Sequence, residues 1–459
     1  MKHMSLKEIA AACDGVYYGD SDSYYKEVSG VAIDSRKIEQ DYLFVAIRGA
    51  RVDGHTFIPQ VMENGALCAI SEDNLGEVPY PYILVSSCEQ ALKDIAEYYR
   101  KSLDIKVVGI SGSVGKTSTK EMIGSVLAQK YSVLKTAGNF NNEIGLPLTI
   151  FNIRDHHAVA ILEMGISHFG DMEPLARMAR PDICVLTNIG SAHLEMLKTR
   201  DGILKEKTDM FRFMEPNGSI VLNGDDDKLS TVTDYKGTSP VFFGLSDDKD
   251  YYATDLINLG LKGTTCTIHT PFGELTATIH IPGEHMVYNA LAGAAVGCKL
   301  GLTLEEIRAG IEALVPISGR NNLIEANGLA IIDDCYNANP DSMKASLDVL
   351  ATANTRKIAV LGDMFELGDK ELERHHEVGV HAANKKIDVI ICIGNFAKEI
   401  AAGAREVAAD SDVPTILHFD TKDAFFAQYQ DIIQKGDTIL VKASHGMEFP
   451  EIVEKLQTM

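Results

Sequence analysis

A glycine-rich segment that begins at Gly112 carries the clearest chemical signal in this chain. It reads Ser111-Gly-Ser-Val-Gly-Lys-Thr-Ser118 and lies between the apolar run 106–110 and a stretch with helical spacing over 117–127. A strand, a glycine loop and a helix in this order direct backbone N–H groups and the positive end of a helix dipole at phosphate. We therefore expect the following residues to bind a nucleotide: Gly112, Ser113, Val114, Gly115, Lys116, Thr117 and Ser118.

Two side chains of this loop suit nucleotide chemistry in particular. Lys116 would reach the β- and γ-phosphates, and the Thr117 hydroxyl would ligate Mg²⁺. The match to the general phosphate-loop pattern is incomplete, because Ile110 stands where that pattern has a glycine. A tight strand-to-helix turn that binds nothing is the alternative, but packing alone does not explain Gly-Lys-Thr at such a junction.

Polar residues also follow the next predicted strands. Glu163 ends the buried strand 158–162, and its carboxylate could hold Mg²⁺ opposite the glycine loop; a solvated strand end is the alternative. His193 follows the strand 183–186, but Mg²⁺ prefers oxygen ligands, so the histidine alone does not indicate a metal. Lys207 lies on an amphipathic helix and, by composition, is an exposed helix lysine.

Two asparagine-rich segments could contact a ligand. Residues 139–143 form an asparagine-rich turn whose neutral side chains both donate and accept hydrogen bonds, and a pure turn explains it equally well. Residues 333–340 are denser in polar groups than a loop needs, which favours ligand contact.

The composition restricts the classes of function. The chain has 459 residues, and 45% hydrophobic and 24% charged residues are typical of a globular protein. A net charge of −22 argues against non-specific nucleic-acid binding, which needs a basic surface. Eight cysteines without a Cys-x-x-Cys pair fit neither a zinc site nor a disulfide framework and favour a reducing, cytoplasmic compartment. The start has no apolar signal region, and no stretch approaches the ~18 apolar residues of a membrane span.

The elements that must position these residues suggest three α/β domains. Residues 1–104 hold short strands, such as 42–47 and 82–86, with a helical pattern between them. Residues 105–315 alternate helices with strands at 107–110, 158–162, 183–186 and 219–222, and these continuous apolar runs indicate a mainly parallel sheet buried on both faces. Residues 264–269 and 274–280 alternate in polarity and predict an edge hairpin.

Residues 316–459 read as a second doubly wound unit. Its predicted strands are 329–332, 357–361, 389–393 and 438–441. Ligands bind beyond the carboxyl ends of such strands, where this sequence places mostly polar residues. The predicted fold is therefore a small N-terminal α/β domain, a central P-loop-type ATPase domain and a C-terminal Rossmann-like domain.

Taken together, these segments resemble the Mur ligase family over nearly the whole chain. The motifs that carry the resemblance are Asp34-Ser-Arg36, Asp53-Gly-His-Thr-Phe57, Ser111-Gly-Ser-Val-Gly-Lys-Thr117, Thr136-Ala-Gly-Asn-Phe-Asn-Asn-Glu-Ile-Gly-Leu-Pro147, Ala192-His-Leu-Glu195, Ser318-Gly-Arg320, Ile332-Asp-Asp-Cys-Tyr-Asn-Ala-Asn-Pro-Asp-Ser-Met343 and Leu361-Gly-Asp-Met-Phe-Glu-Leu-Gly368. The missing first loop glycine is normal for that family. The string 333–340 is the most specific, because it is similar to the member that adds D-alanyl-D-alanine rather than to the one that adds the third amino acid.

The resemblance implies an ATP-dependent, Mg²⁺-using amide ligase of peptidoglycan precursor synthesis. The reaction would join D-alanyl-D-alanine to UDP-N-acetylmuramoyl-tripeptide through an acyl phosphate, and the N-terminal domain would bind the uridine nucleotide. The sequence leaves open whether lysine or diaminopimelate is the third residue of the tripeptide. A cytoplasmic monomer with no nucleic-acid partner and no membrane span is expected.

The resemblance also implies roles that the residues alone do not reveal. Lys207 would be carbamylated and, with His193, would hold a second Mg²⁺, while Thr117 and Glu163 would hold the Mg²⁺ of ATP. Arg320 and Asp334 would line the ATP and acyl-phosphate side of the site, and Asn289 would bind the nucleotide. The remaining predicted substrate contacts are Ser35, Arg36, Asn139, Asn142, Asn337 and Asn339.

Two positions depart from the family pattern. The adenine segment His-Asn-x-x-Asn reads 285–289 His-Met-Val-Tyr-Asn here, so Met286 replaces an asparagine, and His445 stands where an arginine is usual. Two alternatives stay open. One is another ligase of the family, of the tripeptide-forming or folylpolyglutamate type, and the other is a nucleotide-gated binding protein that does not catalyse.

Overall fold

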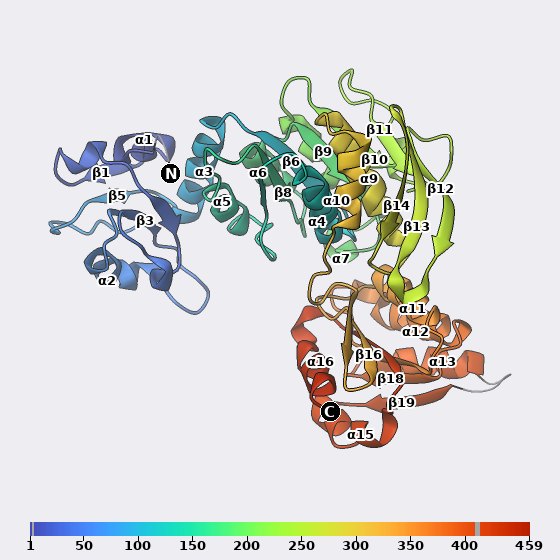
Figure 1. The fold of residues 1–459 in the computed structure, drawn as a ribbon. Coiled ribbons are helices and arrows are strands. Elements are labelled where there is room, and N and C mark those ends of the chain that lie inside the picture. Colours follow the sequence, from blue (N-terminus) through green and yellow to red (C-terminus); the bar gives the residue numbers. More distant parts are fainter. Residues whose placement is uncertain (2–3, 409–413) are drawn as a thin grey trace. The chain divides into compact units, whose positions relative to one another are not determined.

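The computed structural model describes residues 1, 4–408 and 414–459, which form three β-sheets with flanking helices (Figure 1). The three-domain α/β fold class predicted from the sequence is confirmed. By compactness the chain divides into two units, which we describe separately. The first comprises residues 1–111, 130–185 and 206–220, and the second comprises residues 112–129, 186–205 and 221–459.

The first sheet lies in the N-terminal part of the first unit. Its order is β1-β5-β4-β3-β2, and only β1 runs antiparallel to its neighbour. The elements are α1 (Leu6–Ala12), β1 (Val16–Tyr18), β2 (Gly30–Ala32), β3 (Tyr42–Val45), α2 (Ile58–Glu63), β4 (Cys68–Ser71), β5 (Tyr82–Leu84) and α3 (Cys88–Lys101). Helix α2 confirms the predicted helical pattern, because Ile58 and Val61 pack on Phe44 and Ala69 of the sheet.

The second sheet has nine strands in the order β14-β13-β12-β11-β10-β9-β6-β8-β7. Its strands are β6 (Lys106–Ser111), β7 (Val133–Lys135), β8 (Val159–Glu163), β9 (Ile183–Leu186), β10 (Ser219–Asn223), β11 (Val241–Gly244), β12 (Tyr251–Asn258), β13 (Thr264–Thr270) and β14 (Gly273–Ile279). Strands β13 and β14 pair antiparallel at the sheet edge, so the predicted hairpin is confirmed. The helices of this region are α4 (Lys116–Leu127), α5 (Gly145–Ile150), α6 (Met172–Ala179), α7 (Leu194–Leu197), α8 (Arg200–Thr208), α9 (His285–Lys299) and α10 (Leu304–Glu312).

The third sheet has the order β15-β16-β20-β17-β18-β19, parallel except for β15. Its elements are β15 (Asn322–Ala326), β16 (Leu329–Asp333), α11 (Pro340–Ala351), β17 (Lys357–Gly362), α12 (Glu371–Asn384), β18 (Val389–Ile393), α13 (Ala397–Ala408), β19 (Thr415–Phe419), α14 (Lys422–Phe426), α15 (Tyr429–Ile432), β20 (Thr438–Lys442) and α16 (Pro450–Gln457). Neighbouring residues of one strand enter different cores. Ala359 and Leu361 pack with α11, α12 and α13, whereas Ile358 and Val360 pack with α14 and α16. This two-sided burial explains the continuous apolar runs.

The eight cysteines are free thiols distributed over all three sheets and their helices. Seven are buried, and Cys298 is partly buried. Burial raises the pKa of the Cys13 thiol to about 11 and that of Cys392 to about 12, because a thiolate is poorly solvated in an apolar interior.

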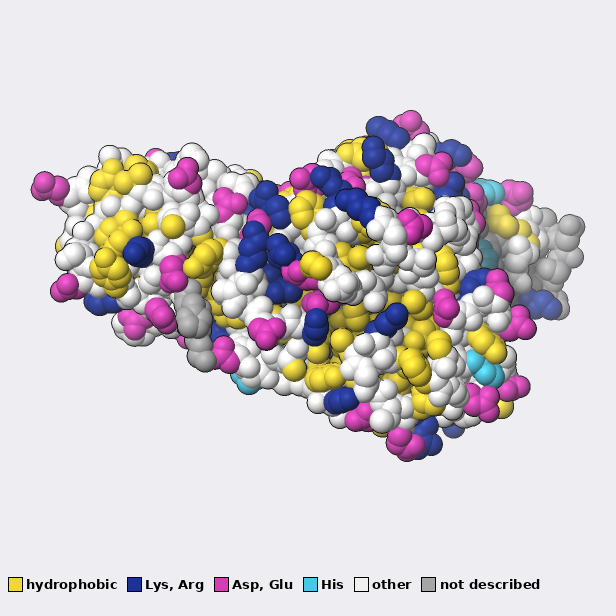
Figure 2. All heavy atoms as spheres, turned by 90° about the horizontal axis from the view of Figure 1, so that it is seen from above, with side chains coloured by type: hydrophobic (Ala, Val, Ile, Leu, Met, Phe, Trp, Pro, Cys, Tyr) yellow, Lys and Arg dark blue, Asp and Glu magenta, His cyan; other side chains and the backbone are white. Residues whose placement is uncertain are grey.

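No helix in the described part of the chain is both long enough and apolar enough to cross a bilayer. On the face drawn in Figure 2, acidic and basic side chains are interspersed. The excess of negative charge is therefore not gathered into one block on that face.

Candidate active site

The glycine loop in the second unit has the backbone that its sequence predicts. Gly115 takes a left-handed conformation, with φ of 82°, and caps α4, which begins at Lys116. Gly112 has φ of 151°, and a Cβ atom placed on it would lie 1.9 Å from Thr187 Oγ1. The Lys116 ammonium donates to the Gly112 carbonyl at 2.8 Å. Both glycines are thus required by the backbone, and Lys116 lies over the loop.

The residues that follow β9 hold this loop in place. Asn188 accepts from the Val114 amide at 2.9 Å and donates to the Val114 carbonyl at 3.1 Å. Thr187 Oγ1 donates to the same carbonyl at 2.6 Å, and the Ser113 amide donates to the Asn188 carbonyl. Asn188 was not among the predicted site residues, and its position at the end of a strand was the signal available in the sequence.

The Ser113 hydroxyl has a distinctive environment. Its oxygen is buried and meets no hydrogen-bond partner among the described residues. Burial of an unpaired hydroxyl costs free energy, so such a group is expected to pair with a ligand. Because it lies in a loop capped by a helix N-terminus, a phosphate oxygen suits it well.

Arg320 connects this loop to the motif 333–340. Its Nη2 donates to Thr117 Oγ1 at 3.2 Å, and its guanidinium carbon lies 4.0 Å from the centre of the Tyr336 ring. The Tyr336 ring also lies 5.5 Å from the ring of His445. The structure therefore brings together two predicted nucleotide residues, Thr117 and Arg320, and adds Tyr336, which the sequence did not single out.

The acidic pair at the end of β16 fixes the turn that carries Arg320. Asp333 Oδ2 accepts from the Gly319 amide at 2.7 Å and from the Ser318 hydroxyl at 3.2 Å. Asp334 makes a buried ion pair with Lys442, with 2.6 Å between Oδ2 and Nζ. Much of the polar density in 333–340 therefore serves internal structure rather than standing open to a ligand.

The two predicted dipeptide contacts of this motif differ in their surroundings. Asn339 caps α11, and its Oδ1 accepts from the Ser342 amide at 2.8 Å. Asn337 is exposed, and its Oδ1 accepts from the amides of Ala338 and His445 at 2.9 and 3.3 Å. Asn337 is therefore the more accessible of the two to a ligand.

Helix α9 carries the segment expected to contact adenine. Asn289 is buried, accepts from the Thr119 hydroxyl at 2.8 Å and donates to the Met286 sulfur at 3.2 Å. Met286, rather than Asn289, lines a small pocket beside Ser118 and Arg320. The side chain of Asn289 is thus already engaged within the protein.

Glu163, in the first unit, ends β8 as predicted. It is buried, its Oε1 accepts from Asn141 Nδ2 at 2.9 Å, and its amide donates to the Thr136 hydroxyl at 2.9 Å. Asn141 was missed, although the asparagine run 139–142 contained the signal. The predicted residue Asn142 accepts at Oδ1 from the amide of Gly145, the first residue of α5, at 2.8 Å, and Asn139 is exposed.

Lys207 differs from its prediction. The side chain is buried, at 2% exposure, so the expectation of an exposed helix lysine is wrong. Glu206, beside it on α8, is also buried and accepts from the amides of Gly170 and Met172 at 3.0 and 2.9 Å. This helix therefore presents two ionisable residues to the interior of the first unit.

His193, in the second unit, has a left-handed backbone with φ of 59°. Its Nδ1 lies 3.0 Å from a carboxylate oxygen of Glu366. The described residues contain no group of three or more histidines, cysteines or acidic residues close enough together to hold a metal ion.

The predicted uridine-side residues form a compact turn. Asp34 Oδ1 accepts from the Arg36 amide at 3.0 Å, and its carboxylate also pairs with the Arg36 guanidinium at 2.8 and 2.9 Å, with Ser35 between them. The Arg36 guanidinium holds the pKa of Asp34 down at about 2. The Arg36 side chain is 87% exposed, so the turn presents a guanidinium to solvent.

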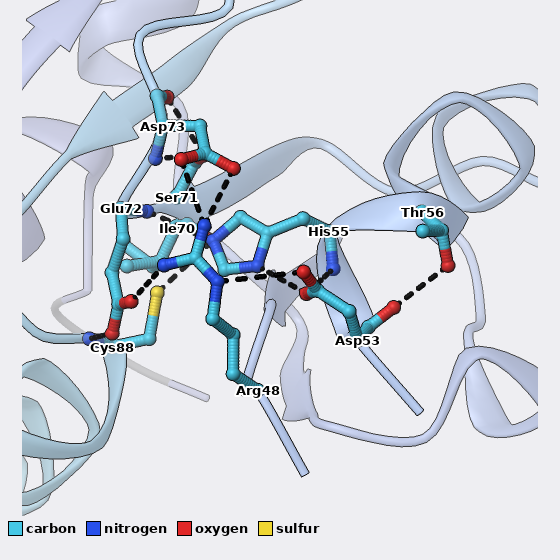
Figure 3. A network of polar contacts seen from close by, with 9 residues as sticks. All are labelled: Arg48, Asp53, His55, Thr56, Ile70, Ser71, Glu72, Asp73 and Cys88. Carbon is cyan, nitrogen blue, oxygen red and sulfur yellow. Dashed lines mark hydrogen bonds and ion pairs between the residues drawn. The ribbon is translucent and has the colours of Figure 1, made fainter. Parts of the chain in front are cut away.

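A second polar network lies in the N-terminal part of the first unit (Figure 3). The Arg48 guanidinium pairs with Asp53, Glu72 and Asp73. His55 Nδ1 lies 2.7 Å from Asp53 Oδ1, and its Nε2 accepts from the Glu72 amide at 3.0 Å. This network ties the segment 48–55 to the end of β4 and explains why the motif 53–57 needs both an aspartate and a histidine.

Comparisons with known proteins agree with this geometry. Residues 27–100, 110–297 and 319–445 match, respectively, "Mur ligase family, catalytic domain", "Mur ligase middle domain" and "Mur ligase, glutamate ligase domain". UDP-N-acetylmuramoyl-tripeptide–D-alanyl-D-alanine ligase of Bacillus subtilis is 37% identical over 94% of this chain and 93% of that protein. The Escherichia coli protein of the same name is 33% identical over 94% of both.

Solved structures give the same picture. A crystal structure of MurF from Acinetobacter baumannii has a TM-score of 0.91, at 30% identity, over 99% of both chains. MurF ligase from Thermotoga maritima in complex with ADP has a TM-score of 0.82, at 30% identity, over 94% of this chain and 97% of that one.

Proposed function

The chain belongs to the Mur ligase family, and from that premise we propose that it is the ATP-dependent ligase that joins D-alanyl-D-alanine to UDP-N-acetylmuramoyl-tripeptide. The observation that carries the proposal is the ordered loop 112–118, with its buried, unpaired Ser113 hydroxyl and with Arg320 on Thr117. Relatives that carry this activity in their names align over 94% or more of the chain, which supports the proposal for all three of its matched regions.

The proposed chemistry follows from the poor reactivity of a carboxylate as an acyl donor. The tripeptide carboxylate attacks the γ-phosphate of ATP, and ADP leaves. The amine of D-alanyl-D-alanine then attacks the acyl phosphate, and phosphate leaves as the amide forms. Two anions must approach each other in the first step, so catalysis depends on positioning and charge neutralisation.

We assign roles to this chain's residues on that basis. Loop amides and the Ser113 hydroxyl bind phosphate oxygens, and Lys116 and Arg320 neutralise the charge of the transferring phosphoryl group. Thr117 and Glu163 are oxygen donors of the kind that Mg²⁺ prefers, so each is assigned to the metal of ATP. When bound, Mg²⁺ supplies positive charge to the phosphate oxygens. Asn337 and Asn339 remain the candidates for the dipeptide, and Ser35 and Arg36 those for the uridine nucleotide.

Carbamylation of Lys207 is part of the proposal. Lys207 is buried, and a lysine carbamate forms when the amine adds to carbon dioxide and releases a proton. The carbamate would be an anionic oxygen ligand, and with His193 it is assigned to a second Mg²⁺. Lys205 is exposed on the same helix and provides the matched control. Lys207→Ala should lose more than nine-tenths of the ligation activity, and bicarbonate should not restore it. Lys205→Ala should keep its activity.

We further propose domain limits at 1–104, 105–315 and 316–459. The three sheets, which span 16–84, 106–279 and 322–442, support that division. A cytoplasmic location is proposed because eight free thiols suit a reducing compartment.

Phosphate release tests the function directly. With ATP, Mg²⁺ and UDP-N-acetylmuramoyl-tripeptide, release should depend on added D-alanyl-D-alanine and should match amide formation measured by mass spectrometry. Both the lysine and the diaminopimelate tripeptide should be supplied. If phosphate release is supported by a single free amino acid, such as glutamate, but not by the dipeptide, the chain would be assigned to another ligase of the family. No release with either tripeptide would indicate a binding protein.

A further inference from the structure

A small pocket in the second unit combines apolar walls with one unsatisfied acceptor. Ile281, Met286 and Ile317 line it on the apolar side, and Ser118, Arg320 and Asn321 line it on the polar side. Ser118 follows the phosphate loop at the start of α4, so the pocket lies next to the site assigned to phosphate. Apolar walls with a few placed polar groups are typical of a site for a flat heterocyclic ligand.

The orientation of the Asn321 amide follows from its neighbours. Asn321 Nδ2 donates to the Pro282 carbonyl, and the Asn321 backbone amide donates to Asp334 Oδ1 at 3.0 Å. A carbonyl accepts only, so the nitrogen must face Pro282 and the oxygen must face away from it. The backbone is left-handed at this residue, with φ of 50°, a conformation that asparagine tolerates better than most residues.

The Asn321 oxygen is the unsatisfied group. The residue is 6% exposed, and Oδ1 has no hydrogen-bond partner among the residues that the structure describes. A buried acceptor of this kind costs free energy when it is unpaired, so it favours a ligand that brings an N–H group.

We propose that Asn321 selects adenine among nucleobases by accepting a hydrogen bond at Oδ1 from the exocyclic amine on the purine ring. This inference rests on the proposed function, because ATP is its ligand. Guanine and hypoxanthine carry a carbonyl oxygen at the same ring position, which would face the Asn321 oxygen and leave two acceptors unpaired. Met286 lies where relatives are expected to carry an asparagine, and its thioether is a weak acceptor, so the polar contact with the base is assigned to Asn321.

The Glu121 carboxylate is another acceptor that lines the pocket, and the test must separate it from Asn321. The carboxylate of Glu121 lies 3.3 Å from Lys120 Nζ, so it already has a charged partner. Glu121→Gln is therefore the matched control. Asn321→Gly removes the amide while keeping the left-handed backbone, and Asn321→Ser is a second variant in case the first does not fold.

The experiment compares ATP with purine riboside triphosphate, which lacks only the exocyclic amine, and with ITP. For the unaltered enzyme, kcat/KM for dipeptide-dependent phosphate release should favour ATP by about tenfold to a hundredfold, since an unpaired site rejects the analogue that lacks its partner. In Asn321→Gly this preference should fall to about twofold, chiefly through loss with ATP, while Glu121→Gln should retain it.

Each outcome bears on the inference separately from the function. If the unaltered enzyme ligates the dipeptide but Asn321→Gly and Asn321→Ser keep the full preference for ATP, the assignment of Asn321 is wrong. Loss of preference in Glu121→Gln alone would transfer the role to that residue. If the unaltered enzyme does not ligate, the proposed function fails. The nucleotide preference can still be measured by binding: each of the three nucleotides competes with a fluorescent ATP analogue, and the displacement of that analogue gives their relative affinities.

Discussion

Substitution of Gly112 by alanine should damage the phosphate loop far more than the same change at Gly115. Both glycines have positive φ, at 151° and 82°, but their surroundings differ. A Cβ on Gly112 would lie 1.9 Å from Thr187 Oγ1, whereas the nearest atoms to a Cβ on Gly115 are 4.0 Å away. The comparison therefore separates steric overlap from backbone strain.

The magnitude follows from two losses at Gly112. Backbone strain at a positive φ costs about 1–3 kcal/mol. To escape the overlap, Thr187 must turn away and lose its 2.6 Å hydrogen bond to the Val114 carbonyl, which contributes about 0.5–1.5 kcal/mol. The total is about 1.5–4.5 kcal/mol for Gly112→Ala, against about 1–3 kcal/mol of strain alone for Gly115→Ala.

Two measurements show where that free energy appears. If the loop keeps its shape, urea unfolding should report the loss in the free energy of unfolding. If the loop rearranges instead, the dissociation constant of ATP should rise by about 10- to 1,500-fold, since each 1.4 kcal/mol is a factor of ten. The double variant Gly112→Ala/Thr187→Ala should lose less than the sum of the single changes, because the overlapping oxygen is gone.

Unchanged stability together with unchanged ATP affinity in Gly112→Ala would refute the reasoning. Equal losses at Gly112 and Gly115 would also contradict it, because the overlap with Thr187 would then contribute nothing. A fully additive double variant would show that Thr187 is not the obstructing residue.

Four further predictions follow from individual contacts. Lys116→Ala should lower the ligation rate by about 10²–10³ while the melting temperature stays the same, since the loss is of charge at the phosphoryl group; near-normal turnover would contradict this. Lys442→Met should lower the free energy of unfolding by about 3–5 kcal/mol, because it leaves the Asp334 carboxylate without its buried partner, and Lys442→Met/Asp334→Leu should recover part of the loss. Tyr336→Leu should raise KM for ATP about fivefold by removing the ring under Arg320, whereas Tyr336→Phe should not. Asp34 has a pKa lowered from 3.8 to about 2, so its stabilising effect is present above pH 4 and is lost as pH falls toward 2; Asp34→Asn should be slightly less stable than the unaltered protein at pH 5 but equal to it near pH 2, and a gap at pH 2 would exclude this cause.

The sequence predicted the elements whose periodicity is strong. The buried strands β6, β8, β17 and β18 and helix α4 were found because continuous apolar runs and helical spacing each have one simple explanation. Strands such as β1, β2 and β15 were missed, since three to five residues at a sheet edge carry too little pattern. Strand β12 was also missed, and there the pairing with β13 shifts register between Thr254 and Ile257, so strict alternation fails.

The sequence predicted the site less well than the fold. Motif residues such as Lys116 and Thr117 can be identified in the sequence by their residue type and spacing. The hydrogen bonds through which Asn188 and Asp333 hold the loop and the Arg320 turn form only once distant segments meet, and the burial of Lys207 depends on packing within its unit. The family resemblance implied the roles of individual residues, whereas the structure revealed the hydrogen bonds that position the loop and Arg320.

The buried free thiols can serve as native probes of local unfolding, because each of the three sheets contains at least one of them. Cys68 lies on β4 of the first sheet, Cys184 on β9 of the second and Cys392 on β18 of the third, and all three are fully buried. A thiol reagent reaches such groups only when the surrounding structure opens, because burial excludes the reagent and disfavours the reactive thiolate. Pulsed labelling read by mass spectrometry would therefore measure the opening free energy of each sheet separately, without any engineered residue, and would reveal whether ATP protects one cooperative unit or the whole molecule.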